Sequence, residues 1–329
     1  MIGTSNLLKR QILIEHDFCE DDMTNWLPAP KRTVKALATA AVMVLSLVTP
    51  TLAGDPFRPN RPHNIGDNTQ KAFEAVFKDG NYQQAESYLN RAESTESSEP
   101  LVYAMQASMA YTEKDWEGLN RYATKTLQAA EQLTRTDPLR GNIYLAAGQF
   151  LEGAYNYKKD GPVGALTKLQ KVFQYLDEAK KIDPNDPELN LLTGYMDLML
   201  AVNLPFSKPD QAIEKLEKYG APPYLVYRGI AVGYNNLKQY PKAMDYVERA
   251  IQLTPTNPDL SYLKAQILVR QGKKQEAVAF FKQALDKKAQ LPRRYVAQIS
   301  FEQCKVENSL SGTNRDCDAE RDRIRDGTN

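Results

Sequence analysis

The stretch Tyr240-Pro-Lys-Ala-Met-Asp-Tyr-Val-Glu-Arg-Ala250 decides the fold, because it recurs 34 positions later as Lys274-Gln-Glu-Ala-Val-Ala-Phe-Phe-Lys-Gln-Ala284. Small residues keep one register across this repeat, in the pairs Ala231 and Ala265, Ala243 and Ala277, and Ala250 and Ala284. Two antiparallel helices approach closely only where side chains are small, with larger apolar residues filling the gaps. Thr254-Pro255 then ends the second helix, since proline cannot continue it. The pattern therefore predicts helical hairpins that repeat every 34 residues.

A 34-residue hairpin with small, aromatic and terminal-proline positions resembles the unit of the tetratricopeptide-repeat (TPR) family. The same frame appears at Phe73–Ala92 around Gly80-Asn-Tyr82, more weakly at Ala107–Ala123, and again at Leu176–Pro184. The resemblance implies an all-α solenoid of stacked antiparallel helix pairs in a right-handed superhelix, with about six units over 66–291. Two units depart from the pattern, one at Lys158-Lys-Asp-Gly-Pro162 and one at the insert Ala201–Pro209, which predicts a longer loop between helices.

Residues 1–53 read as an N-terminal extension followed by a signal peptide. The thirteen uncharged positions 36–48 follow Lys31, Arg32 and Lys35 and precede Pro50-Thr-Leu-Ala53. This run is short for a membrane span, and a basic start with a small-residue exit is typical of a secretory signal, so we expect cleavage after Ala53. The alternative is an uncleaved anchor formed by residues 33–49. Five acids lie before Met23, which indicates that Met23 is the initiator or that 1–22 form a cytoplasmic extension.

Export would place the chain in the periplasm or the thylakoid lumen. The leader followed by Asp55-Pro-Phe-Arg58, Ile65-Gly-Asp67 and Gly80-Asn-Tyr82 resembles exported TPR proteins of cyanobacteria. Residues 54–65 hold closely spaced prolines, which fix φ and offer no amide donor, so a proline-rich extended tether is predicted there.

The composition excludes several function classes. Lys plus Arg (42) nearly balance Asp plus Glu (41), which argues against a nucleic-acid binder and against a polybasic membrane-surface protein. His16 and His63 are the only histidines, so a histidine base or metal site has almost no material. Phosphate-loop, zinc and nucleophile-elbow motifs are missing, so we expect no enzyme, no cofactor and no metal. An enzyme site in the irregular middle units, around Tyr155, Tyr157 and Tyr195, is the remaining alternative.

The C-terminal region is predicted to cap the solenoid. Tyr295, Val296, Ile299 and Phe301 form an apolar stripe at helical spacing, so 292–308 read as a capping helix and 309–329 as a loosely held polar tail. Cys19 precedes the leader, which leaves two cysteines in the exported part. An even count in an oxidising compartment favours a Cys304–Cys317 disulfide; the alternative is two unpaired thiols.

The resemblance also implies where a partner would bind, since the first helices of stacked units line a concave groove. A mixture of aromatic, neutral polar and basic side chains at these positions suits a protein or peptide partner. The register assigns the groove to Gln70, Glu74, Phe77, Ser108, Tyr111, Leu191, Tyr195, Arg228, Val232, Asn235, Tyr262, Gln266 and Arg270. The alternative for any single tyrosine is that it fills space between helices.

The function expected from these features is an exported scaffold or adaptor that assembles or maintains a membrane-associated complex. The alternative is a permanent structural subunit of such a complex. Arg228 and Val232 stand where chaperone-binding TPR proteins carry a lysine and asparagine clamp, which disfavours that partner class. No small-molecule substrate and no nucleic acid are expected.

Overall fold

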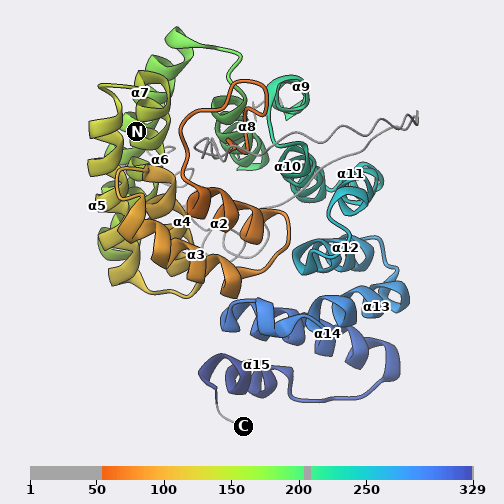
Figure 1. The fold of residues 1–329 in the computed structure, drawn as a ribbon. Coiled ribbons are helices and arrows are strands. Elements are labelled where there is room, and N and C mark those ends of the chain that lie inside the picture. The colour runs from red at the N-terminus through yellow and green to blue at the C-terminus, as the bar shows by residue number, and fades with distance from the viewer. Residues whose placement is uncertain (1–53, 204–208, 328–329) are drawn as a thin grey trace, which may run out of the picture.

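The computed structural model describes residues 54–203 and 209–327, and across these two ranges it contains helices and no strand (Figure 1). The bounds are α2 (Asp67–Phe77), α3 (Tyr82–Thr95), α4 (Pro100–Thr112), α5 (Trp116–Leu133), α6 (Pro138–Asp160), α7 (Pro162–Ile182), α8 (Pro187–Asn203), α9 (Pro209–Tyr219), α10 (Pro223–Asn236), α11 (Tyr240–Leu253), α12 (Pro258–Arg270), α13 (Lys274–Leu285), the 3₁₀ turn η1 (Lys288–Gln290), α14 (Arg293–Ser311) and α15 (Cys317–Asp326). Consecutive helices from α2 to α13 pack as pairs. The predicted all-α, TPR-type solenoid is confirmed.

The helix starts follow from local sequence. Proline occupies the first position of α4, α6, α10 and α12, where its missing amide costs nothing and its fixed φ suits a helix. Short polar side chains cap other starts: Asn81 accepts from the amide of Gln84, and Asp115 accepts from the amide of Gly118. These signals set where each helix begins without reference to the rest of the chain.

The alanines that define the repeat lie where helices approach most closely. Ala231, Ala243 and Ala250 are fully buried, as are their counterparts Ala265, Ala277 and Ala284. Each helix of a hairpin therefore presents a small residue to its partner, which is the packing reason for the 34-residue period.

The middle units are longer than the regular ones. α6 and α7 are joined by Gly161 alone, at φ 71°, a left-handed backbone conformation that favours glycine. The predicted insert begins inside α8, which continues to Asn203, and residues 204–208 lie outside the described part of the chain.

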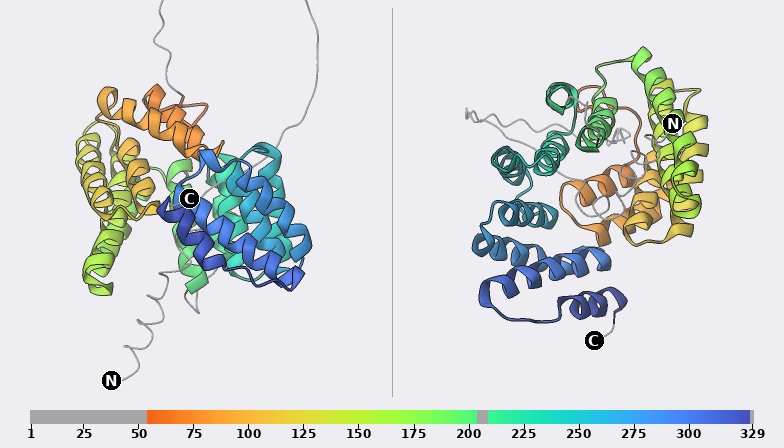
Figure 2. Two further views of the ribbon diagram at one scale, coloured as in Figure 1. Left: turned by 90° about the horizontal axis from the view of Figure 1, so that it is seen from below. Right: turned by 180° about the vertical axis from the view of Figure 1, so that it is seen from behind.

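The superhelix curves until its first hairpin meets its last units, as the views in Figures 1 and 2 show. Tyr82 at the start of α3 donates a hydrogen bond to Asp259 on α12, with Oη and Oδ2 2.8 Å apart. The ring of Tyr82 also packs edge-on against Tyr295 of α14, with centroids 6.5 Å apart. Farther along, Arg294 donates from Nε to the carbonyl of Glu113 at 2.8 Å. The first hairpin therefore lies against the start of α12 and against α14.

The C-terminal region is more ordered than a polar tail. α14 buries Tyr295, Ile299 and Val306 against the last repeat. Residues 317–326 of the predicted tail form α15, capped by Asp316, whose carboxylate accepts from the amide of Ala319. Cys304 and Cys317 are bonded as a disulfide, with Cα atoms 5.6 Å apart, so α15 is held against α14.

The described part of the predicted tether, residues 54–65, is packed among the helices, which corrects the prediction of an extended spacer. Asp55, Phe57 and Ile65 are buried. The segment bends through turns closed by the amides of Arg58 and Arg61, and the side chains between its prolines are anchored. In the described residues no helix is both long and apolar enough to cross a bilayer, and the predicted leader lies outside them.

Candidate functional site

A buried network of charged residues joins the N-terminal segment to α8. Arg58 donates from Nε and Nη2 to the two carboxylate oxygens of Asp186, at 2.6 and 2.7 Å. Its third nitrogen, Nη1, donates to Glu188 at 2.9 Å and to Asp55 at 3.0 Å. Asp186 also caps α8 by accepting from the amide of Leu189. A bidentate pair of this kind has a fixed geometry, so it holds the segment in one position in addition to neutralising the buried carboxylate.

A second arginine continues the network into α4 and α6. Arg140 is 1% exposed and donates from Nη2 and Nη1 to Glu99, at 2.8 and 3.1 Å. Its Nε donates to Glu188 at 3.3 Å, and the hydroxyl of Tyr144 donates to the other oxygen of Glu188. Glu188 is therefore shared between both arginines, so α6, α8 and the N-terminal segment meet at this one carboxylate, and Arg140 connects it to Glu99 at the start of α4.

Burial and charge oppose one another at these carboxyls. Burial alone raises the pKa of Glu188, but Arg140 and Arg58 outweigh it and hold that pKa below its usual range. At Asp186 burial dominates over the attraction of Arg58, so the pKa is raised. Buried ions of this kind are tolerated only when they are paired and hydrogen-bonded.

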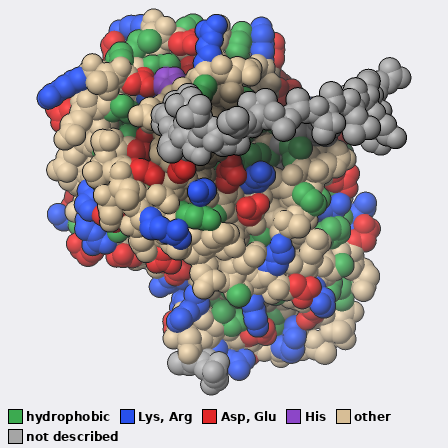
Figure 3. All heavy atoms as spheres, viewed as in Figure 1, with side chains coloured by type: hydrophobic (Ala, Val, Ile, Leu, Met, Phe, Trp, Pro, Cys, Tyr) green, Lys and Arg blue, Asp and Glu red, His purple; other side chains and the backbone are tan. Residues whose placement is uncertain are grey.

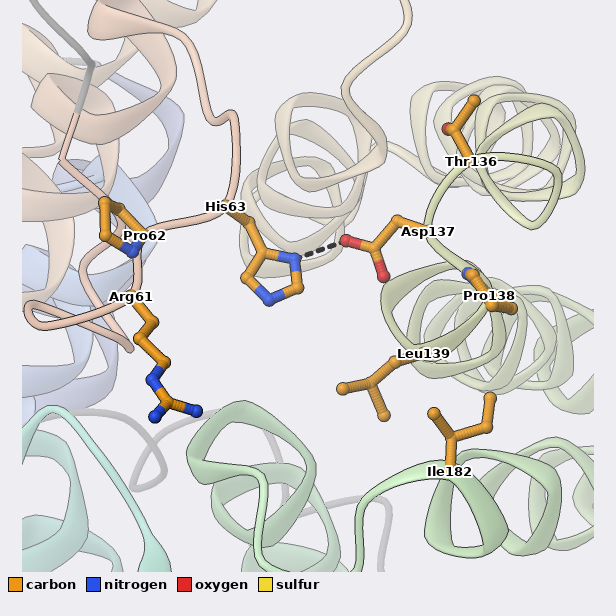
Figure 4. A pocket seen from close by; sticks show the side chains of 8 residues that line it. All are labelled: Arg61, Pro62, His63, Thr136, Asp137, Pro138, Leu139 and Ile182. Atoms are coloured by element: carbon orange, nitrogen blue, oxygen red, sulfur yellow. Dashed lines mark hydrogen bonds and ion pairs between the residues drawn. The ribbon is translucent and has the colours of Figure 1, made fainter.

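A cavity of about 520 Å³ opens beside the N-terminal segment (Figure 4). Nδ1 of His63 is hydrogen-bonded to the carboxylate of Asp137, which begins α6. Burial raises the pKa of Asp137, but the hydrogen bonds from His63 and from the amide of Arg140, together with the charges of these two residues, outweigh burial and lower that pKa. Apolar side chains from three elements complete the wall, and the whole lining is Arg61, Pro62, His63, Thr136, Asp137, Pro138, Leu139 and Ile182.

The structure separates the predicted groove residues into two groups. The buried ones are Phe77, Leu191, Arg228, Val232, Asn235, Tyr262 and Gln266. The partly or fully exposed ones are Gln70, Glu74, Ser108, Tyr111, Tyr195 and Arg270. Tyr195 donates its hydroxyl to the carbonyl of Leu225, and Tyr262 donates to Glu302. Whether these positions bind a partner remains a prediction.

Several buried polar atoms on the concave side have no hydrogen-bond partner. They are Nε and Nη1 of Arg228, both side-chain atoms of Asn235, and Oε1 of Gln266. Beside them Asp259 leaves Oδ1 without a partner, and burial raises its pKa to about 6. Unpaired buried polar atoms are rare in folded proteins because each loses its hydration, so their concentration on α10 and α12 needs an explanation.

The alternative enzyme site in the irregular middle units was predicted around Tyr155, Tyr157 and Tyr195. Tyr155 and Tyr157 are partly exposed on α6, and Tyr195 lies against Gly229, where its ring would be 2.7 Å from an added Cβ. No group of three or more residues suited to holding a metal ion occurs among the described residues. The face in Figure 3 carries both signs of charge interspersed, without a single-sign patch.

Sequence reasoning missed the charged network. In the sequence Asp186 lies in Asp183-Pro-Asn-Asp186, a stretch typical of a turn between repeats, and Arg58 lies in the predicted tether. An isolated charge at the start of a helix is the ordinary pattern of a cap, and nothing in the spacing distinguishes a cap that is also an ion-pair partner. The sequence signal that could have indicated this network is the position of Arg58 between an aromatic residue, Phe57, and a proline, Pro59.

Comparisons with known proteins give one family model and one solved structure to report. The family model described as the auxiliary subunit of N-terminal acetyltransferase A matches residues 189–298. Among solved structures the chain is similar to a thermophilic TPR protein of Thermus thermophilus, at 15% identity and a TM-score of 0.30, covering 73% of this chain and 97% of that one. So loose a superposition carries no argument, and the TPR type rests on the helix pairs and their spacing. No curated protein matches the chain.

Proposed function

We propose that this TPR-type chain is an exported scaffold that binds a polar segment of a protein partner on the concave side of α10 and α12. The observation that carries the proposal is the set of unpartnered buried atoms on Arg228, Asn235 and Gln266. All three belong to the groove predicted from register. A peptide backbone or an acidic side chain offers the donors and acceptors that these atoms lack.

The position of the first hairpin against α12 has a consequence for binding. Arg228, Asn235 and Gln266 are each less than a tenth exposed, so a partner reaches them when α2 and α3 move away from α12. The contacts that hold the hairpin there include polar ones, Tyr82 with Asp259 and Asn257 with the carbonyls of Phe77 and Lys78. Partner binding and opening at this junction are therefore coupled in the proposal.

The finer part of the proposal concerns place and partner. The leader-like residues 36–48 support export to the periplasm or thylakoid lumen, with retention at the membrane by 33–49 as the alternative. The family that matches residues 189–298 is described as an auxiliary subunit, in keeping with a chain that acts through a protein partner. Mass spectrometry of the native protein tests export, and a mature chain beginning at Gly54 is the expected result. An intact N-terminus retained after carbonate washing would instead favour the anchor.

The binding part is tested by crosslinking pull-down from native membranes with the full chain. Arg228→Met and Asn235→Ala are expected to lose a partner that the wild-type chain captures. Arg91→Met on exposed α3 is the matched control, because Arg91 bonds only within its own helix. Equal capture by all variants with wild-type helicity would refute the concave site. Washing at rising salt separates an adaptor, which is released, from a permanent subunit, which is retained.

A further inference from the structure

The N-terminal segment is held in the superhelix as a bound peptide is held. The backbone–backbone hydrogen bonds of residues 55–65 are internal to the segment, such as the amide of Arg58 to the carbonyl of Asp55. Pro56, Pro59 and Pro62 have no amide hydrogen to donate. Among the described residues the segment is thus attached to the helices by side chains alone, apart from its covalent link to α2.

Four side chains make that attachment. Phe57 is 5% exposed and packs edge-on against Phe73 of α2, with ring centroids 5.0 Å apart. Arg58 enters the network on α8, His63 binds Asp137, and Ile65 is fully buried. An aromatic and an arginine next to one another, each filling its own pocket, are the anchors that commonly dominate peptide affinity.

The helices supply a receptor that is incomplete without a cation. Once Asp55 and Arg58 are set aside, the helical part of the network holds Glu99, Asp186 and Glu188 against Arg140 alone. With the segment in place these carboxylates are nearly inaccessible to water, and the Arg58 guanidinium neutralises their excess negative charge. The two parallel bonds to Asp186 match the planar fork of a guanidinium and do not suit an ammonium.

The cavity in Figure 4 borders the same segment along Arg61, Pro62 and His63. Arg61 is exposed, and Asn64 next to His63 is exposed as well. One side of the segment therefore faces open space beside the cavity.

We propose that residues 55–63 occupy a second peptide-binding site as a ligand tethered to the chain. The same site binds a segment of a partner protein in which an aromatic residue is followed directly by arginine, with a proline on each side of this pair. The partner segment displaces the chain's own segment and uses the same pockets. The inference shares with the proposed function the premise that the chain binds protein segments, but it uses none of the residues on α10 and α12. The tether gives the internal segment a high effective concentration, so a free peptide competes poorly until that segment is disabled.

The test uses the full chain and a fluorescein-labelled peptide with the sequence of residues 54–65, followed by fluorescence anisotropy. The double variant Phe57→Ala/Arg58→Ala is expected to bind the peptide at least about tenfold more tightly than the wild-type chain or the control Arg61→Ala. A peptide with lysine in place of Arg58 is expected to bind about tenfold more weakly, because the fork to Asp186 is lost. No binding to a double variant that keeps wild-type helicity would overturn the proposal.

A second measurement covers a variant that fails to fold. Hydrogen–deuterium exchange of the wild-type chain is measured with the unlabelled peptide in excess, at roughly millimolar concentration. Faster exchange of the amides of Phe57, Arg58 and His63 is expected, while the peptide with lysine leaves them unchanged. Unchanged exchange with the native peptide would overturn the proposal. The Arg228→Met variant is expected to respond to the peptide as the wild-type chain does, whether or not it captures a partner on the concave side. Failure of the proposed function and failure of this second site can therefore be told apart.

Discussion

Arg58 and Asp186 are joined by two parallel hydrogen bonds, Nε to Oδ2 at 2.6 Å and Nη2 to Oδ1 at 2.7 Å, across 128 positions of sequence. The pair is buried, and Asp186 at the same time caps α8. One carboxylate thus starts a helix of the fourth unit and anchors a segment that precedes the first. The network therefore connects the N-terminal segment to α8, α6 and the start of α4, three successive units of the superhelix.

Replacing Arg58 with methionine tests how much this ion pair contributes to the free energy of unfolding. The change removes the ion-pair partner of buried Asp186 and leaves Glu188 paired with Arg140 alone, and breaking one side of a buried pair typically costs about 3–5 kcal/mol. Urea denaturation followed by circular dichroism measures the loss. Arg61→Met, at an exposed position of the same segment, is expected to stay within about 0.5 kcal/mol of wild type. Equal stability of both variants would show that the pair contributes nothing net.

Tyr82→Phe tests the contact between the first hairpin and α12. The substitution removes the hydroxyl that donates to Asp259 and leaves a buried carboxylate oxygen unpaired, at a cost of about 1–3 kcal/mol. Tyr88→Phe is the control on the same helix, because its hydroxyl is paired with Gln84 at the surface. Thermal unfolding compares the two, and a larger loss in the control would contradict the closing role.

Asp259 should make stability depend on pH. Burial raises the pKa of its carboxyl from 3.8 to about 6, so between these values the folded chain binds a proton that the unfolded chain releases. The stabilisation from this proton is present below about pH 4 and is lost as the pH rises through about 6. Asp259→Asn removes this titration. The free energy of unfolding of the variant, relative to that of wild type, should therefore rise by on the order of 3 kcal/mol between about pH 4 and 7. Denaturation at both pH values measures this, and a constant difference would argue against the raised pKa.

Reduction of the Cys304–Cys317 disulfide should loosen α15. The closed loop spans 13 positions, for which the loss of chain entropy is worth up to about 3 kcal/mol. Cys317→Ser is expected to become protease-sensitive between α14 and α15 while the repeats stay intact. A reductant should reproduce this in the wild-type chain and have no further effect on the variant. Free-thiol labelling of both cysteines in the native protein would contradict the bridge.

Enlarging the buried alanines should strain the hairpins. Ala243→Leu or Ala277→Leu places a larger side chain where two helices touch and should cost about 1–3 kcal/mol. Ala279→Leu, at an exposed position of α13, is the control and should be close to neutral. Chemical denaturation of the three variants gives the comparison; neutral changes at Ala243 and Ala277 would show that close packing does not explain the repeat.

The helices and their period could be predicted because their causes are local. Alanines 34 residues apart mark the contacts within hairpins, prolines mark helix starts, and the stripe that includes Tyr295 and Ile299 marks the helix that covers the last repeat. The disulfide followed from the even number of cysteines after the leader. Each of these inferences needs only neighbours along the chain or the adjacent repeat, and in the described residues each has a direct structural counterpart.

The charged network and the closing of the superhelix were decided by tertiary structure alone. Whether Arg58 meets Asp186, or Tyr82 meets Asp259, depends on small rotations between successive helix pairs that add up over the solenoid. No local pattern records that sum, so the same prolines and polar residues that indicate an extended tether also fit a segment bound between helices. The sequence by itself determined the repeating unit, because a unit is stabilised by contacts within it and with its neighbours. Only the accumulated curvature determined which distant side chains those units bring together.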